Sequence, residues 1–118
     1  LLLLDRDESA LHAVQLALYG SGLLDRDDLV LCDIRDTAAL QKVFERNRPD
    51  VVFHAAALKH LPILERYPEE GWKTNVVGSL NVLQCAYVNG VEVAAANAHI
   101  DAKTSLRITR LLQSNNFG

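Results

Sequence analysis

Three short apolar runs divide the first half of the chain, and each is followed by a stretch with helical spacing. The runs are residues 1–4 (LLLL), 28–32 (DLVLC) and 51–53 (VVF). Continuous apolar runs of this length are typical of parallel strands that are buried on both faces. Strands that alternate with helices form parallel sheets, because a crossover must carry the chain back to the same end of the sheet. The pattern therefore predicts an α/β fold with right-handed crossovers.

The segments between these runs contain residues that typically begin and end helices. Asp7 and its acidic and hydroxyl neighbours are expected to begin the first helix, and the Gly20-Ser21-Gly22 stretch to end it. Asp36 is expected to cap the second helix. A third helix is predicted from about Pro68. The expected inner faces are Leu11, Val14 and Leu18 for the first helix and Leu40, Val43 and Phe44 for the second, and the apolar face of the third is Val76, Leu80, Leu83 and Tyr87.

Composition narrows the class of protein. A chain of 118 residues with 49% hydrophobic residues is expected to form a single domain. Its net charge of -3 argues against a nucleic-acid partner, which would require a basic patch. No apolar run approaches the roughly 20 residues of a membrane span. The cysteines, Cys32 and Cys85, fall inside a predicted strand and a predicted helix, which favours buried thiols in a reducing, cytoplasmic compartment.

The stretch of residues 50–81 is expected to hold the functional site. Three alanines follow His54 at the carboxyl end of the third apolar run. In open α/β sheets, ligands bind in the crevice beyond the carboxyl ends of the strands. Small residues there would let a cofactor approach the backbone. Lys59 and His60 follow, and they would place a cation and an imidazole beside this crevice.

The segment HAAALKHLPILERYPEEGWKTNVVGSLNVL closely resembles part of the extended short-chain dehydrogenases/reductases. Within them it is similar to the polysaccharide-biosynthesis branch, the nucleotide-sugar 4,6-dehydratases that act on UDP-N-acetylglucosamine and its relatives. HAAALKH followed by TN-x-x-G-x-x-N is more specific than a glycine-loop match, and the resemblance covers roughly residues 1–91. It implies an NAD(P)-binding Rossmann-like doubly wound parallel sheet and a lyase reaction. That reaction oxidises the sugar at C4, eliminates water across C5 and C6, and returns the hydride to C6.

The resemblance implies cofactor roles for residues after the first two strands. Asp5 would accept hydrogen bonds from the adenosine ribose, whereas Arg6 could instead attract a 2′-phosphate, so NAD and NADP both stay open. Asp33 would bind the adenine amino group, and Ile34 would lie against the ring. The alternatives are that Asp5 belongs to a charged helix start and that Asp33 is ordinary turn chemistry.

The resemblance also implies roles around the third strand. Lys59 and His60 would bind substrate, with an exposed loop cation as the alternative for Lys59. Asn75 would organise the site by bonding backbone. His54 and His60 lack a third ligand at usable spacing, so no metal site is expected. The backbone cradle for the cofactor would be Ala55, Ala56 and Ala57, for which close packing is the alternative reading.

Two parts of the family machinery are not found in the sequence. One is the opening strand with its glycine-rich turn, which holds the pyrophosphate. The other is the proton-transfer segment, for which Asp101 and Lys103 are the only candidates and have the wrong spacing. We therefore interpret residues 1–96 as a partial dinucleotide-binding domain that lacks its first strand, and residues 97–118 as a divergent C-terminal helix and tail.

The expected function is that of a truncated relative of a 4,6-dehydratase, inactive as an isolated chain. Two alternatives stay open: an epimerase or reductase of the same superfamily, and a non-catalytic interaction module on the same scaffold. The strand order 3-2-1-4-5-6 places the missing first strand between residues 1–4 and 51–53. We expect this gap to be closed by direct pairing of these two runs or, preferably, by association into a homo-oligomer.

Overall fold

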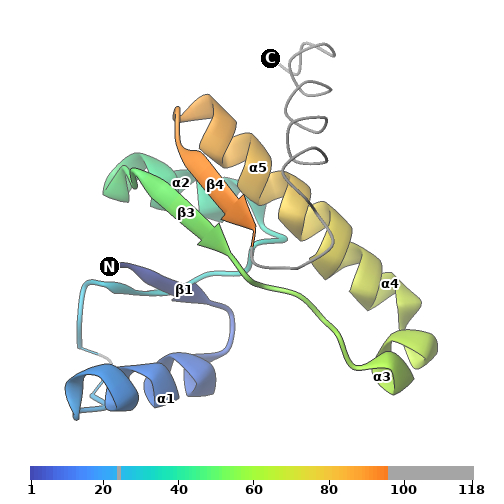
Figure 1. Ribbon diagram of the computed structural model, residues 1–118, viewed down its shortest axis with the longest axis horizontal. Helices are drawn as coiled ribbons and strands as arrows, with labels where there is room; N and C mark the ends of the chain where they lie inside the picture. Colours follow the sequence, from blue (N-terminus) through green and yellow to red (C-terminus); the bar gives the residue numbers. More distant parts are fainter. Residues whose placement is uncertain (24, 96–118) are drawn as a thin grey trace.

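The computed structural model describes residues 1–23 and 25–95, and it has the expected alternation of strands and helices (Figure 1). Ten elements follow one another in these described residues. They are β1 (Leu3–Asp5), α1 (Glu8–Tyr19), β2 (Leu29–Leu31), α2 (Thr37–Asn47), β3 (Val51–His54), α3 (Leu61–Arg66), α4 (Pro68–Gly71), the π-helix η1 (Trp72–Gly78), α5 (Ser79–Val88) and β4 (Glu92–Ala95). The three predicted strands are confirmed, and β4 confirms the candidate strand at residues 91–96. The predicted helix and tail at residues 97–118 lie outside the described residues.

The strands form two separate parallel pairs. β1 pairs with β2, with Leu3 opposite Leu29. β3 pairs with β4, with Val51 opposite Glu92. Among the described residues β1 and β3 do not pair with each other, so the direct pairing that we considered is wrong. The doubly wound strand order accounts for this, since it leaves one strand position between these two strands.

Side-chain caps begin the two crossover helices as the sequence predicts. The Asp7 carboxylate accepts hydrogen bonds from two amides in the first turn of α1. The Asp36 carboxylate accepts one from the first turn of α2. Gly20 ends α1 in the left-handed conformation, with φ of 70°. A residue with a Cβ would be strained there, which explains the glycine at this position.

The buried face of α1 differs from the predicted one. Leu11 and Gln15 are buried, whereas Val14 and Leu18 are exposed. Among the described helices and strands, α1 packs only against β1 and β2. Two short strands cover a narrow strip of the helix, so spacing alone overestimated the width of its buried face.

The core lies between α2, α5 and the segment that follows β2. The inner face of α2 is confirmed, because Leu40 and Phe44 are buried and Val43 packs against them. Cys32 and Cys85 are buried free thiols, as predicted. The full cluster is Cys32, Ile34, Leu40, Phe44, Val82, Cys85 and Ala86.

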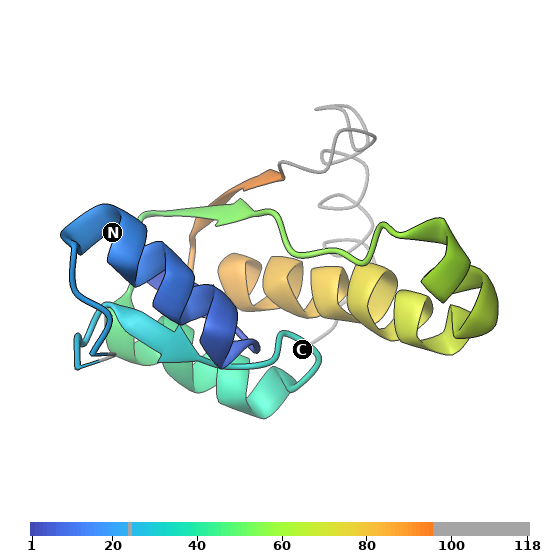
Figure 2. The same ribbon diagram turned by 90° about the horizontal axis from the view of Figure 1, so that it is seen from below.

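The helical segment after β3 is longer than predicted and turns a different side to the core. It starts with α3, and α4, η1 and α5 follow; Figure 2 shows η1 and α5 as one continuous rod. Leu80 and Tyr87 from the predicted apolar face are exposed. The buried residues of this segment are Gly71, Thr74, Gly78, Asn81, Val82, Cys85 and Ala86. Gly78 allows this approach, because an added Cβ would lie 2.6 Å from Ile34 Cδ1.

Candidate functional site

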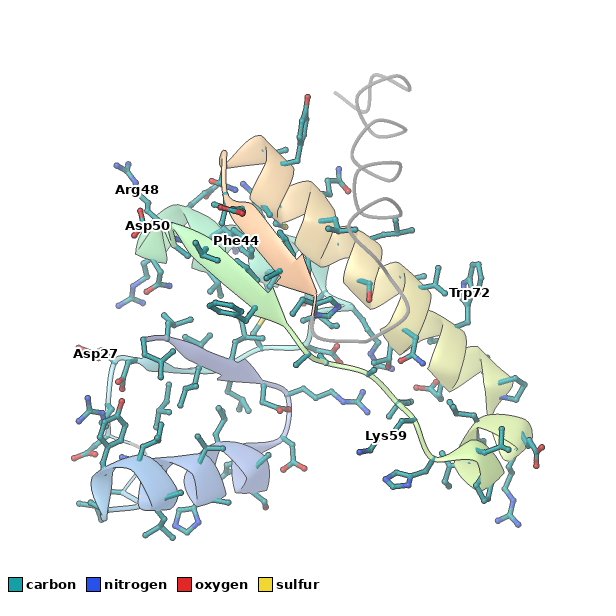
Figure 3. The ribbon with its side chains drawn as sticks, viewed as in Figure 1. Asp27, Phe44, Arg48, Asp50, Lys59 and Trp72 are labelled. Carbon is teal, nitrogen blue, oxygen red and sulfur yellow. The ribbon has the colours of Figure 1, made fainter. Side chains whose placement is uncertain are left out.

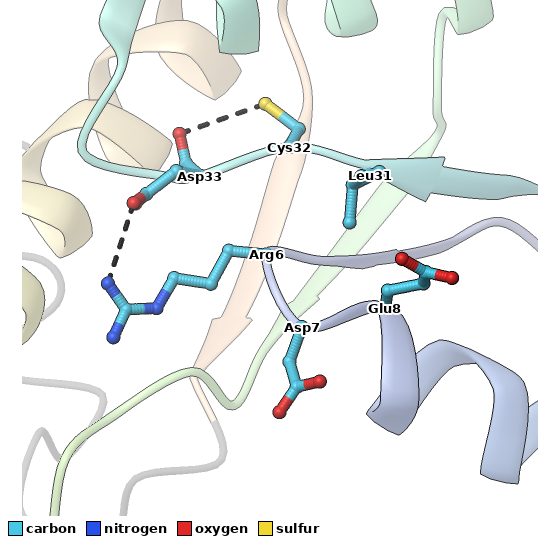
Figure 4. A pocket seen from close by; sticks show the side chains of 6 residues that line it. All are labelled: Arg6, Asp7, Glu8, Leu31, Cys32 and Asp33. Atoms are coloured by element: carbon cyan, nitrogen blue, oxygen red, sulfur yellow. Dashed lines mark hydrogen bonds and ion pairs between the residues drawn. The ribbon is translucent and has the colours of Figure 1, made fainter.

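A shallow depression of about 610 Å³ lies where β1 and β2 end (Figure 4). Because the strands are parallel, their carboxyl ends meet at the same edge, which is where α/β sheets bind ligands. The structure brings together two predicted site residues there: Arg6 Nη1 lies 3.6 Å from Asp33 Oδ2. The lining residues are Arg6, Asp7, Glu8, Leu31, Cys32 and Asp33.

Asp33 is held by a second arginine that the sequence analysis missed. Arg35 donates from Nε to both carboxylate oxygens of Asp33, at 3.1 and 3.0 Å, and from Nη2 to Oδ2 at 2.8 Å. Its backbone amide also donates to Asp33 Oδ1. These bonds, chiefly those from the guanidinium, lower the pKa of Asp33. The carboxylate therefore stays ionised at neutral pH and can accept a hydrogen bond from an amino group.

The other two residues predicted at the adenosine end have different surroundings. Asp5 ends β1 and is exposed, and its Oδ1 accepts a hydrogen bond from the Asp7 amide at 2.9 Å. Ile34 is buried and packs against Gly78. Neither side chain lines the depression, and their cofactor roles stay predictions.

The loop after β3 is anchored by Asn75. The Asn75 amide donates from Nδ2 to the Leu58 carbonyl and accepts from the Leu58 amide, both at 2.8 Å. Asn75 thus bonds backbone, as the family resemblance implies. The predicted substrate residues follow directly and are exposed: Lys59, which is labelled in Figure 3, and His60. Ala55, Ala56 and Ala57 precede Leu58 and are also exposed.

The end of β3 is joined to α5 by a contact between buried His54 and half-buried Ser79 that was not predicted. His54 Nε2 and the Ser79 hydroxyl are 2.8 Å apart. Burial lowers the pKa of His54, so the imidazole is neutral at pH 7. The described part of the chain has no group of three side chains placed to hold a metal ion.

Further charged residues link the depression to the helices after the loop. Arg35 Nη1 lies 2.7 Å from Glu70 Oε2, and Glu70 Oε1 lies 2.9 Å from Lys73 Nζ. The i,i+3 spacing of Glu70 and Lys73 could have indicated their pair. No sequence signal joins Arg35 to Glu70, which is 35 positions away. Asp101 and Lys103, the candidates for proton transfer, lie outside the described residues.

No helix in residues 1–23 and 25–95 has the length and apolar character needed to span a membrane.

The fold is that of the dinucleotide-binding enzymes. UDP-glucose 4-epimerase from Thermus thermophilus, solved in complex with NAD, matches with a TM-score of 0.54 at 22% identity, covering 74% of this chain and 33% of that one. Residues 1–97 match the family model described as "Polysaccharide biosynthesis protein". The chain belongs to this family.

Two curated relatives connect the chain to nucleotide-sugar chemistry. The probable polysaccharide biosynthesis protein EpsC of Bacillus subtilis is 32% identical over 95 residues, which are 78% of this chain and 16% of that protein. UDP-N-acetylglucosamine 4,6-dehydratase (inverting) of Campylobacter jejuni is 43% identical over 68 residues, which are 54% of this chain and 19% of that protein. The chain therefore spans less than a fifth of the length of either relative.

Proposed function

We propose that this chain forms part of the NAD(P)-binding half of a nucleotide-sugar 4,6-dehydratase of polysaccharide biosynthesis, acting on a UDP-N-acetylglucosamine-like sugar. The observation that carries the proposal is the meeting of Arg6 and Asp33 at the carboxyl ends of two neighbouring parallel strands. Ionised Asp33 fits the amino group of an adenine, and the similarity to a UDP-N-acetylglucosamine 4,6-dehydratase supports the reaction class.

In this proposal the described residues bind and orient, and bound NAD(P) supplies the acceptor and donor of the hydride. Asp33 and Arg6 hold the adenosine end, and Asp5 holds its ribose. The three alanines after β3 let the middle of the cofactor approach the backbone. Lys59 and His60 face the sugar nucleotide, and Asn75 keeps their loop in place through Leu58.

We propose NAD over NADP as the preferred cofactor. Three carboxylates and one guanidinium line the depression, from Asp7, Glu8, Asp33 and Arg6. Asp5 adds a further carboxylate at the end of β1. An extra 2′-phosphate would be repelled by this excess of negative charge, whereas a ribose hydroxyl can donate to a carboxylate. Tighter binding of NADP than of NAD to the chain would contradict this preference.

Calorimetric titration with ADP-ribose tests the nucleotide site directly. Asp33→Asn should weaken binding about tenfold, since a charge-assisted hydrogen bond contributes about 1.5–3 kcal/mol and this carboxylate is partly exposed. Asp27→Asn is the matched control, because Asp27 is exposed and does not line the depression. Equal affinity of the wild type and Asp33→Asn would contradict the site, as would no binding at all.

A complete homologue with the same HAAALKH loop tests the substrate side. Lys59→Ala should impair nucleotide-sugar binding or turnover more than NAD(P) binding, because Lys59 lies past the alanines. Lys42→Ala, at an exposed position of α2, is the control. A 4-keto-6-deoxy product from UDP-N-acetylglucosamine supports the dehydratase, and a C4-epimerised sugar supports the epimerase alternative. Absence of nucleotide binding would favour the non-catalytic interaction module.

We also propose that the chain associates with itself. Among the described residues β1 and β3 each pair on one side only, and Phe53 on β3 is 77% exposed. Unpaired strand edges and bare apolar side chains favour association. Sedimentation at micromolar concentration should show an oligomer that Phe53→Lys weakens, while Leu23→Lys, in an exposed loop, leaves it intact. A well-folded, strictly monomeric chain would refute association.

A further inference from the structure

Three consecutive ion pairs run from the depression to the π-helix. They are formed by Asp33, Arg35, Glu70 and Lys73, which together we call the charged ladder. Asp33 follows β2, Glu70 lies in α4 and Lys73 lies in η1. The ladder therefore joins parts of the chain that are far apart in sequence.

Arg35 is the central residue of the charged ladder. Its guanidinium uses Nε and Nη2 on Asp33 and Nη1 on Glu70, so one planar group holds two carboxylates in fixed directions. The Arg35 side chain is 27% exposed, which limits the screening of both pairs by water. A lysine has one point charge and could not reproduce this fork.

The far end of the ladder lies beside the loop anchor. Lys73 and Asn75 are both in η1, and Asn75 holds the amide and the carbonyl of Leu58. Displacement of Glu70 would shift the start of this helix and with it the Asn75 amide. The helix would then transmit the change to the loop of residues 55–60.

We propose that Arg35 and Glu70 are positioning residues that couple the nucleotide-binding depression to the loop of residues 55–60. The proposal rests on the proposed function, because it takes the depression as the adenosine site. A nucleotide that bonds Asp33 fixes Arg35, Arg35 fixes Glu70, and the helix then holds the substrate loop more firmly. Coupling of this kind is reciprocal, so an ordered loop also favours nucleotide binding.

Hydrogen exchange at the Leu58 amide in the chain without ligand tests the structural step. Glu70→Gln and Arg35→Met should each make Leu58 exchange roughly two- to fivefold faster, the size expected for a partly exposed ion pair. Glu69→Gln is the matched control, because Glu69 adjoins Glu70 and its side chain forms no ion pair within the described residues. The Leu40 amide, which bonds the Asp36 carbonyl, reports the core and should exchange unchanged.

Addition of ADP-ribose tests the coupling itself. It should slow Leu58 exchange in the wild type, much less in Arg35→Lys, and not at all in Arg35→Met. Unchanged Leu58 exchange in both ligand-free variants would overturn the coupling, and so would equal slowing by ADP-ribose in the wild type and Arg35→Met. If the wild type binds no ADP-ribose, the nucleotide function and its coupling both fail, while the ligand-free comparison still decides whether the ladder positions Leu58.

Discussion

The two βαβ units of the chain share a plan and differ in how much they bury. The first unit is residues 3–31, with α1 crossing between β1 and β2. The second is residues 51–95, with the longer helical segment crossing between β3 and β4. α1 buries only Leu11 and Gln15. α5 buries four residues and also packs on α2, so the core belongs to the second unit and to the β2–α2 segment that precedes it.

This difference shows that one two-stranded sheet alone does not bury the apolar face of a crossover helix. Several apolar side chains of α1 are exposed: Val14, Leu16, Leu18 and Tyr19. A two-stranded sheet covers too little of a helix to hide them. The first unit therefore depends on local contacts, such as the Asp7 cap and the Gly20 terminus.

The largest expected effect is a difference in the free energy of unfolding that is lost when each of two leucines is truncated. Leu40 is 1% exposed in the core, and Leu18 on α1 is 52% exposed. Leu40→Ala should lower the free energy of unfolding by about 2–5 kcal/mol, because it leaves a cavity. Leu18→Ala should lower it by less than about 0.5 kcal/mol. Urea unfolding of both variants measures the difference, and equal losses would show that α1 packs as tightly as α2.

A smaller loss is expected where α5 meets the chain after β2. Asn81 is buried and donates from Nδ2 to the Ile34 carbonyl at 2.9 Å. Asn81→Ala leaves that carbonyl without its donor and should cost about 1–3 kcal/mol of unfolding free energy. Gln84→Ala, at an exposed site on the same helix, is the control. A loss for Asn81→Ala no larger than the control's would mean that water replaces the amide.

Sequence reasoning succeeded where a residue's local role decides the structure. Asp7, Asp36 and Gly20 act on backbone groups within one turn, so their residue type alone predicts the helix ends. The β-α alternation likewise predicts parallel pairing, because the crossover geometry leaves little choice. For the site, the same reasoning brought Arg6 and Asp33 to one edge of the sheet.

Sequence reasoning failed where contacts between distant segments decide the structure. The core side of α5 is set by Gly78 and Asn81 meeting Ile34, and a small or polar residue gives no apolar signal. The π-helix shifts the phase of the helix, which a period of 3.6 residues cannot show. Arg35 joins Glu70 because the fold brings the turn after β2 to α4, 35 positions further along the chain.

The two units should also differ in how they make folding stability depend on pH. Burial lowers the pKa of His54 from 6.5, whereas His12 on α1 is exposed. The unfolded chain then binds a proton at His54 before the folded chain does. Folding stability should therefore fall as the pH drops below about 6.5, by at most about 1.4 kcal/mol per pH unit, and level off below the folded pKa. Urea unfolding at pH 7.5 and 5.5 measures this.

Substitution of His54 tests this assignment. His54→Gln should flatten the loss between pH 7.5 and 5.5. Carboxylates with lowered pKa values, such as Asp33 and Glu70, lose their contribution only at lower pH. The same slope in His54→Gln as in the wild type would place the titrating group elsewhere.

The smallest effect on stability concerns a cluster of side chains in the first unit. It connects the end of α1 to the residues before β2. Asp28 accepts hydrogen bonds from Arg26 and from the Tyr19 hydroxyl, and the Arg26 guanidinium lies 3.7 Å from the centre of the Tyr19 ring. Arg26 is the main cause that lowers the pKa of Asp28 to about 2. Any stability from this cluster is present above the unfolded pKa, 3.8, and is lost as the pH falls through about 2.

The carboxyl signal of Asp28, followed by NMR during an acid titration, measures that pKa. In Arg26→Met its midpoint should rise toward 3.8, and in Tyr19→Phe it should rise less, because the Tyr19 bond is a weaker cause than the arginine. Unfolding at pH 7 should barely change in either variant, since exposed pairs are screened by water. A wild-type midpoint near 3.8 would mean that the cluster does not persist in solution. The first unit would then keep only its helix ends, and its difference from the second unit would be larger than the structure shows.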